Sequence, residues 1–361
     1  MRFPEFSGEW ENTELQYIAP NICSGKDKPT SNGTVALYGS TGIIGMTRLA
    51  SYNEEIVLVA RVGANAGQLQ ITTIPCGVTD NTLIINAKEW NRYIYYYLQH
   101  YNLNRLVFGS GQPLITGSML KKLKIIYGEE SERNKIVNLL CLLDERIATQ
   151  NKIIEKLQSL IKGLIDDIIT LKCGQLVAFE TLYSKAGEGG TPTTSNTEFY
   201  DNGSIPFIKI DDLSNKYLSA NKDYITELGL KKSSAWLIPT HSIIYSNGAT
   251  IGAISINKYP VCTKQGILGI VPNTNIDVEF LYYFMQSSYF QKEVERVVTE
   301  GTMKTAYLKD INHIKCPIPD LDRQKEISHL LSVLSLKEDV ERQLLQKYQI
   351  QKQYLLRKMF I

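Results

Sequence analysis

The chain has 361 residues, which is long enough for about two domains that each bury a core of their own. Its 43% hydrophobic and 21% charged residues are typical of a globular protein, and no apolar run reaches the roughly 18 residues that a membrane helix needs. A formal net charge of +2 does not by itself indicate a nucleic-acid-binding protein. The six cysteines form no CxxC pair, and residues 1–16 lack the basic end and apolar stretch of a secretion signal. We therefore expect reduced thiols in a cytoplasmic protein, rather than disulfides or a zinc site.

The first 130 residues have the pattern of short strands separated by turns. A strand is predicted over 35–38, before the turn Gly39–Gly42, and another over 54–62, before the glycine loop Gly63–Gly67. The tyrosine-rich run 93–97 is typical of a buried helix, because clustered aromatic side chains more often build a core than a platform on which bases stack.

A long helix is predicted over 131–172, a segment that contains no proline. Apolar residues recur there at steps that alternate between four and three, which is the a/d pattern of a coiled coil. The polar Gln150 interrupts this seam, and a single polar residue at such a position often fixes the register of a helix pair. The apolar members of the seam are Ile136, Leu140, Leu143, Ile147, Ile154, Leu157, Ile161 and Leu164.

The second globular segment, 173–321, opens with a stretch that the first segment lacks. This stretch has turns at Gly189–Pro192 and Asn202–Gly203 and a predicted strand over 205–211. A further apolar run leads into the glycine loop Gly248–Gly252. The aromatic run 280–284 indicates a second buried helix.

A second long helix is predicted over 322–361, with a less regular seam. Its apolar members are Ile327, Leu331, Leu334, Leu345 and Leu355. Three charged residues interrupt it: Glu338, Glu341 and Lys352. A neighbouring stripe predicts that the contact face shifts along the helix, and it consists of Leu336, Val340 and Leu344. At about 1.5 Å per residue each long helix would extend roughly 50–60 Å, so we expect the two helices to bury their stripes against each other.

The chain contains one unit twice. The glycine loops 63–67 and 248–252 match, and 133–169 aligns without a gap on 324–360, in the same order along the chain. In the helices the residues Ile136, Leu139, Leu140, Leu143, Lys156, Gln158 and Leu164 are identical to Ile327, Leu330, Leu331, Leu334, Lys347, Gln349 and Leu355. We predict a mixed α+β fold with an internal pseudo-two-fold repeat, divided into 1–130, 131–172, 173–321 and 322–361. The first and third segments are globular, and the other two are the long helices.

Motifs for catalysis are absent from the sequence. The four histidines are scattered without metal-ligand spacing, and no serine or cysteine nucleophile pattern accompanies them. The loop GANAG lacks the GKS or GKT ending of a phosphate-binding loop, and no NPPY or DPPY marks an amino-methyltransferase. We expect this polypeptide to catalyse no reaction alone.

Several motifs carry a family resemblance. RFPEFSGEW, followed by LYGSTGIIG and ARVGANAG, resembles the first target-recognition domain of the specificity (S) subunits of type I restriction–modification systems. GEGGTPTTSNTEFYDNGSIPFIKIDDLS resembles another subtype of that domain, and IKCPIPDLDRQKEIS is similar to the approach to the family's second conserved helix. One departure is KIIYGEESERNKI, which lacks the proline that usually precedes the first helix.

The resemblance implies a function. Each recognition domain would bind one half-site of a split, asymmetric double-stranded DNA sequence, and the helices would pair antiparallel and hold the domains apart. Two methyltransferase (M) subunits that carry S-adenosylmethionine and methylate adenine N6 would dock on the chain. Restriction/translocase (R) subunits that use ATP and Mg would join them, while this chain would bind no cofactor or metal and no membrane. Two alternatives remain open: a coiled-coil scaffold with two protein-binding domains and no DNA role, and a self-sufficient DNA-modifying enzyme.

Candidate DNA-contacting residues are hydrogen-bonding side chains in or beside the glycine turns, where backbone can approach DNA closely. In the first domain they are Ser40, Thr41, Arg48, Arg61, Asn65 and Gln112. In the second domain they are Thr191, Lys209, Ser246, Asn247, Thr250 and Lys304. Arginine can bond guanine through two atoms, and asparagine or glutamine can do the same with adenine. Each residue could instead stabilise a turn or be a solvated polar group, and Arg48 and Lys209 could equally contact phosphate.

Overall fold

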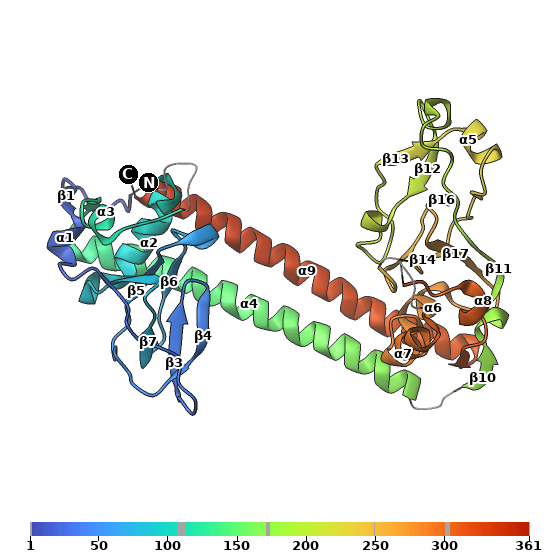
Figure 1. Cartoon of the computed structure of the whole chain (residues 1–361), viewed down its shortest axis with the longest axis horizontal. Helices are drawn as coiled ribbons and strands as arrows, with labels where there is room; N and C mark the ends of the chain where they lie inside the picture. Colours follow the sequence, from blue (N-terminus) through green and yellow to red (C-terminus); the bar gives the residue numbers. More distant parts are fainter. Residues whose placement is uncertain (1, 107–112, 171–173, 249, 300–303, 361) are drawn as a thin grey trace. The chain divides into compact units, whose positions relative to one another are not determined.

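The chain forms two compact units in the computed structural model (Figure 1). The structure describes residues 2–106, 113–170, 174–248, 250–299 and 304–360. Unit 1 comprises Met1–Lys152 and Gln343–Ile361, and unit 2 comprises Ile153–Arg342. Each unit therefore contains one globular segment and part of each long helix. The predicted division treats each long helix as a segment of its own, and that division stays a prediction.

Unit 1 contains two small sheets and a strand pair. The larger sheet is antiparallel and has the order β2 (Cys23–Ser24), β8 (Thr82–Ile85), β5 (Val57–Ala60), β6 (Leu69–Ile71). The smaller sheet has the order β4 (Gly42–Thr47), β3 (Val35–Gly39), β7 (Cys76–Val78), in which β3 and β7 are parallel. The separate pair joins β1 (Glu11–Glu14) to β9 (Lys124–Tyr127). The helices of this globular part are α1 (Leu15–Ile18), α2 (Asn91–Tyr101) and α3 (Gly117–Lys121).

Unit 2 repeats this plan. Its larger sheet has the order β11 (Tyr183–Glu188), β17 (Ile267–Pro272), β14 (Ile243–Ser246), β15 (Ile254–Ile256). Its smaller sheet has the order β13 (Asp223–Ile225), β12 (Ile205–Ile208), β16 (Cys262–Thr263), in which β12 and β16 are parallel. The strand pair is β10 (Gln175–Ala178) with β18 (Lys315–Ile318). The helices are α5 (Glu227–Lys231), α6 (Val278–Phe284), α7 (Ser288–Val297) and α8 (Leu308–Ile311).

The matching strand orders confirm the internal repeat. They also correct one expectation, because the strand predicted over 205–211 does have a counterpart in the first copy. That strand, β12, is the middle strand of its small sheet, as β3 is in unit 1. The two strands were not matched because a sheet position is defined by pairing with distant strands, and the local sequences are unlike.

The two long helices are α4 (Glu130–Thr170) and α9 (Leu321–Met359). In unit 1 the first turns of α4 share a hydrophobic core with the last turns of α9, through Leu140 and Leu143 on one helix and Leu355 and Met359 on the other. In unit 2 the last turns of α4 share a core with the first turns of α9. The helix segments within each unit therefore run antiparallel. Coiled-coil packing along the whole length stays a prediction.

The predicted seams face the interior of the units. Every apolar seam residue named for α4 and α9 is buried or half-buried, and Gln150 is only 5% exposed. The seam of α9 keeps this orientation at its charged positions, since Glu341 is buried and Glu338 and Lys352 are half-buried. The expected shift of the contact face is wrong at Leu336 and Val340, which are 64% and 50% exposed, whereas Leu344, the third residue of that stripe, is half-buried.

The aromatic helices belong to the cores. Tyr93, Tyr96 and Tyr97 of α2 and Tyr283 and Phe284 of α6 are all buried. They pack with strands of the larger sheets and with the long helices. The expectation that these aromatic residues build a core, rather than a base-stacking platform, is confirmed.

Candidate nucleic-acid interface

The two glycine loops occupy equivalent places in their units. Arg61 follows β5, and Asn247 follows β14. Each donates its backbone N–H to the carbonyl just before the neighbouring strand, β8 (3.0 Å) or β17 (3.1 Å). The carbonyl oxygens of Arg61 and Asn247 accept, at 2.9 Å, from the amides of Ile115 and Ala306, respectively. These four hydrogen bonds hold both loops in the same frame.

The loops close in the same way but differ in length. Gly67 donates its N–H to the carbonyl of Ala60 (2.9 Å), and Gly252 donates its N–H to that of Ser246 (3.0 Å). Both glycines have positive φ, +89° and +100°, a conformation that L residues with a side chain rarely adopt. From the last residue of the preceding strand to the closing glycine, the first loop is one residue longer than the second. Residues that match in the sequence alignment of the two loops therefore follow their strands at different distances.

A hollow of about 500 Å³ lies beside each loop. In unit 1 its polar lining consists of carboxamides: Asn65, Gln68, Gln99, Asn102 and Asn104. In unit 2 the polar and charged residues of the lining include Gln291, Glu295 and Lys304, beside Tyr245. One backbone frame therefore presents two chemically different surfaces.

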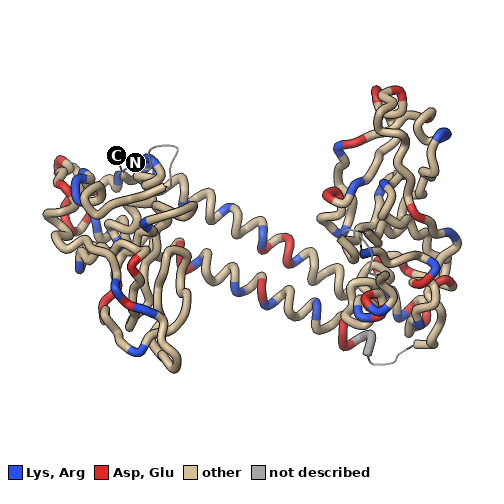
Figure 2. Tube along the Cα trace, in the orientation of Figure 1, with Lys and Arg blue, Asp and Glu red and all other residues tan. Residues whose placement is uncertain are grey.

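Charge is mixed in both units. Figure 2 shows lysine and arginine interspersed with aspartate and glutamate in both globular parts and along the long helices. Among the described residues, no group of three or more histidine, cysteine, aspartate or glutamate side chains is placed to hold a metal ion. No helix in the described ranges is both long and apolar enough to cross a membrane.

Comparison with known proteins gives a consistent result. The family model described as "Type I restriction modification DNA specificity domain" matches residues 2–159 and again residues 183–348. The two matches cover most of the chain. The chain belongs to this family.

Relatives of this specificity family include the Escherichia coli type I restriction enzyme EcoR124I/EcoR124II specificity subunit, 27% identical over 66% of this chain. The Methanocaldococcus jannaschii MjaIX specificity subunit is 32% identical over 40% of this chain. The aligned region spans 62% and 34% of these relatives' lengths, respectively. The fold is similar to the crystal structure of a type I system S subunit from M. genitalium, with a TM-score of 0.66, 17% identity and coverage of 98% and 96% of the two chains.

The specificity-family fold places the predicted DNA-contacting residues in three groups. Six are exposed: Thr41, Arg48, Asn65, Lys209, Thr250 and Lys304. Three are half-buried: Ser40, Arg61 and Thr191. Two are buried: Ser246 and Asn247. Gln112 lies outside the described residues.

The burial of Ser246 and Asn247 corrects their assignment. They are 0% and 1% exposed, so in this structure neither side chain can touch DNA. The Asn247 Nδ2 atom donates to the carbonyl of Ala306 at 3.1 Å, which fastens the segment before α8 against the end of β14. The sequence does not show whether a polar residue beside a glycine loop is buried or exposed, because the same side chain can hydrogen-bond the protein's own backbone or contact a ligand at the surface.

Two basic candidates already have protein partners. The Lys209 Nζ atom lies 2.8 Å from Asp223 Oδ1, but both side chains are exposed, at 45% and 40%, so the ion pair offsets only part of the lysine charge. Arg48 donates to the carbonyl of Ser31 at 3.1 Å while its side chain stays exposed. Lys209 therefore contacts a negatively charged group, whereas the contact of Arg48 is with an uncharged carbonyl.

A glutamine that sequence reasoning missed supports the first turn. The Gln70 Nε2 atom donates to the carbonyls of Gly39 (2.9 Å) and Ser40 (3.1 Å), which ties the β3–β4 turn to β6. Ser40 itself donates to the carbonyl of Asn81 at 3.2 Å. This leaves Thr41 as the exposed hydroxyl of the turn. Nothing in the local sequence around Gln70 signals a contact with a turn thirty residues earlier.

Proposed function

We propose that this chain is the DNA specificity subunit of a type I restriction–modification complex. It binds a split, asymmetric sequence in double-stranded DNA, with one half-site for each recognition domain. The observation that carries this proposal is the pair of glycine loops, which share one hydrogen-bonded frame and border hollows with unlike polar linings. A duplicated frame with divergent side chains suits two half-sites of different sequence, because base edges are read by the side chains that reach them.

The base-contacting residues are the exposed candidates of each loop and turn. In the first domain they are Thr41, Arg48 and Asn65, supported by Ser40 and Arg61. In the second domain they are Thr250 and Lys304, with Thr191 and Lys209 in supporting positions. The carboxamide lining beside the first loop favours adenine, whose exposed edge offers one donor and one acceptor to an asparagine or glutamine.

The chain positions partner proteins and catalyses nothing itself. Two M subunits bring S-adenosylmethionine, and R subunits bring ATP and Mg. An exposed apolar stripe on α9 supports the docking of a partner on that helix, since Leu330, Val333, Leu336 and Val340 are 47–64% exposed. Side chains of this kind, repeated along one helix, favour burial against another protein.

The mixed surface charge indicates how the binding energy is shared. Affinity for DNA depends strongly on the number of phosphates that lysine and arginine neutralise. With a net charge of +2, the chain alone provides little of this attraction. We therefore propose that the M subunits supply much of the phosphate contact, and that this chain selects the sequence.

A methylome of a host that expresses this chain with and without its M subunit tests the proposal. The expected result is a split motif, with two short half-sites, a constant gap and one methyladenine in each half-site, that appears only when both proteins are present. If no such motif appears while the two proteins form a complex, the scaffold alternative is favoured. If methylation appears with this chain alone, the chain is an enzyme and the proposal fails.

A further inference from the structure

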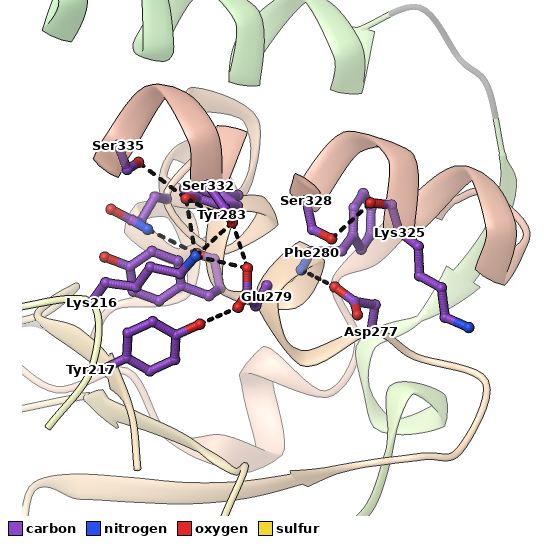
Figure 3. Close-up of polar contacts among 12 residues, drawn as sticks. Lys216, Tyr217, Asp277, Glu279, Phe280, Tyr283, Lys325, Ser328, Ser332 and Ser335 are labelled. Atoms are coloured by element: carbon purple, nitrogen blue, oxygen red, sulfur yellow. Dashed lines mark hydrogen bonds and ion pairs between the residues drawn. The ribbon is translucent and has the colours of Figure 1, made fainter. Parts of the chain in front are cut away.

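A cluster of polar side chains joins the second recognition domain to α9 (Figure 3). The Lys216 Nζ atom lies 2.8 Å from Glu279 Oε2, 2.8 Å from Ser332 Oγ and 3.2 Å from the hydroxyl of Tyr283. The hydroxyl of Tyr283 also lies 3.1 Å from Ser335 Oγ. The Lys216 and Glu279 side chains are 17% and 29% exposed, so water reaches this cluster only in part.

The cluster connects three parts of unit 2. Lys216 precedes β13 and is fixed to the larger sheet, because the amide of Ile256 in β15 donates to its carbonyl at 2.7 Å. Glu279 is in the first turn of α6, and its second carboxylate oxygen accepts from the hydroxyl of Tyr217. Ser332 belongs to α9. The sheet, the domain helix and the long helix therefore meet at one ion pair.

Unit 1 contains a counterpart at equivalent positions. Arg92 and Tyr96, one turn apart on α2, contact Cys141 and Asp144, one turn apart on α4. Arg92 Nη1 lies 2.9 Å from Cys141 Sγ, and the hydroxyl of Tyr96 lies 2.9 Å from Asp144 Oδ2. In the repeat alignment these four positions correspond to Glu279, Tyr283, Ser332 and Ser335.

The charge of the ion pair is reversed between the copies. On the domain helix the first copy has the cation, Arg92, which binds Glu55 through two hydrogen bonds of 2.8 Å. The second copy has the anion there, Glu279, which binds Lys216. Glu55 and Lys216 are both carried by the strand-bearing part of their domain. Both copies thus link the strand-bearing part, the domain helix and the long helix, but the positive and negative members of the ion pair exchange places.

This geometry resists rotation of the domain about the long helix. Apolar packing is tolerant of small sliding, whereas hydrogen bonds weaken steeply with distance and angle. Because each helix makes two contacts one turn apart, the pair of contacts restricts both the sliding of one helix along the other and the rotation between them. The Lys216–Glu279 pair is partly withdrawn from water and shared by several hydroxyl groups, so it adds more than an exposed pair would. In the first copy the Arg92 side chain is 49% exposed, so its pair with Glu55 adds less.

We propose that these two clusters are positioning devices that set the rotation of each recognition domain on the long helix that follows it, and thereby the gap at which the half-sites are read. The effect on the gap between half-sites rests on the proposed function, whereas the effect on the rotation of the domain does not. Lys216, Glu279 and Tyr283 act in the second domain, and Arg92, Tyr96 and Asp144 act in the first. None of these residues contacts DNA.

The first test uses the full chain assembled with its M subunit. The variant Glu279→Gln is compared with the control Glu293→Gln, whose carboxylate is also 29% exposed but pairs with Arg296 inside α7. Binding is measured for DNA with the native gap and with the gap changed by one base pair. We expect Glu279→Gln to lower the preference for the native gap by about threefold or more. Glu293→Gln should leave the preference unchanged.

Reversing the charges of Lys216 and Glu279 tests whether the ion pair itself, rather than either side chain alone, positions the domain. Lys216→Glu and Glu279→Lys each place like charges together, and each should lower the gap preference. The double variant should restore most of it, because the neighbouring groups Tyr217, Tyr283 and Ser332 carry hydroxyls that can donate or accept. A double variant no better than the worse single variant would overturn the proposal.

A second readout does not depend on DNA. Spin labels on noncanonical residues at the exposed positions Lys222 and Asp339 report the distance between the recognition domain and α9 within unit 2. The distance distribution should broaden or shift in Glu279→Gln and stay unchanged in Glu293→Gln. Identical distributions in both variants would overturn the inference. If the wild-type complex shows no gap preference at all, the proposed function fails, and the spin-label result still decides the positioning role.

Discussion

The carboxyl group of Glu279 titrates in a half-buried site with three donors around it. Burial raises the pKa of this group, but hydrogen bonds from Lys216, Ser332 and Tyr217 together outweigh burial and bring the pKa below its ordinary value of 4.5. A carboxylate with a depressed pKa in the folded chain stabilises the fold above the pKa of the unfolded chain. This stabilisation is lost as the pH falls through the folded pKa.

The effect of Glu279→Gln on the free energy of unfolding should therefore depend on pH. The variant should be less stable than the wild type at pH 7, and the difference should shrink as the pH falls below about 4.5. Denaturant unfolding at a series of pH values measures it. A difference that stays constant from neutral pH to about pH 3 would show that the charge of Glu279 contributes nothing.

Exposed loop residues should act on single base positions. Asn65→Ala should relax recognition at one position in one half-site, at a cost of about 1–3 kcal/mol, and Thr250→Ala should do so in the other half-site. Competition binding with DNA in which one base pair at a time is changed measures this. The matched control is Asn151→Ala, which removes an exposed carboxamide from α4. An equal loss for every DNA sequence would instead indicate a phosphate contact.

At the scale of the elements, α4 has a buried seam and an exposed flank. Leu140 is 0% exposed within the core that α4 shares with α9, and Leu142 on the same helix is 59% exposed. Leu140→Ala should lower the free energy of unfolding by about 2–5 kcal/mol, because it leaves a cavity. Leu142→Ala should change it by about 0.5 kcal/mol or less. Similar losses for both variants, in denaturant unfolding of the full chain, would contradict the assigned seam.

The contacts between the domain helices and the long helices also limit which residues can be exchanged between the copies. The tyrosine that links the domain helix to the long helix is present twice, as Tyr96 and Tyr283, but its hydroxyl contacts the carboxylate of Asp144 in one copy and the hydroxyl of Ser335 in the other. Asp144 is further tied to Lys352 of α9 at 2.6 Å. A domain transplanted between the copies would therefore place this tyrosine against a partner that differs in charge, a carboxylate in one copy and a neutral hydroxyl in the other.

At the scale of the whole molecule, the repeat predicts that half-sites are independent. Replacement of residues 179–313, between β10 and β18, by the same region of another member of the family should change one half-site of the methylated motif. The other half-site should keep its sequence, because the first glycine loop is untouched. A methylome of the chimera, expressed with its M subunit, measures this. A change in both half-sites would contradict the assignment of one half-site to each domain.

Much of this molecule follows from local patterns in the sequence. The duplicated order of motifs, the two long helices and the buried faces of α4 and α9 were predicted correctly. Each of these depends on residues close in the chain: a heptad step, or a glycine that needs positive φ. The family resemblance was visible in the same short motifs.

The tertiary structure decided what depends on distant partners. It buried Ser246 and Asn247, paired Lys209 with Asp223 and placed Lys216 against Glu279, 63 residues later in the chain. A polar side chain looks the same in sequence whether it clamps a core or faces solvent, and an ion pair forms only where the fold brings two charges together. The sequence alone therefore determined the repeat and its helices, whereas only the tertiary structure decided which polar residues of each copy are free to meet a ligand.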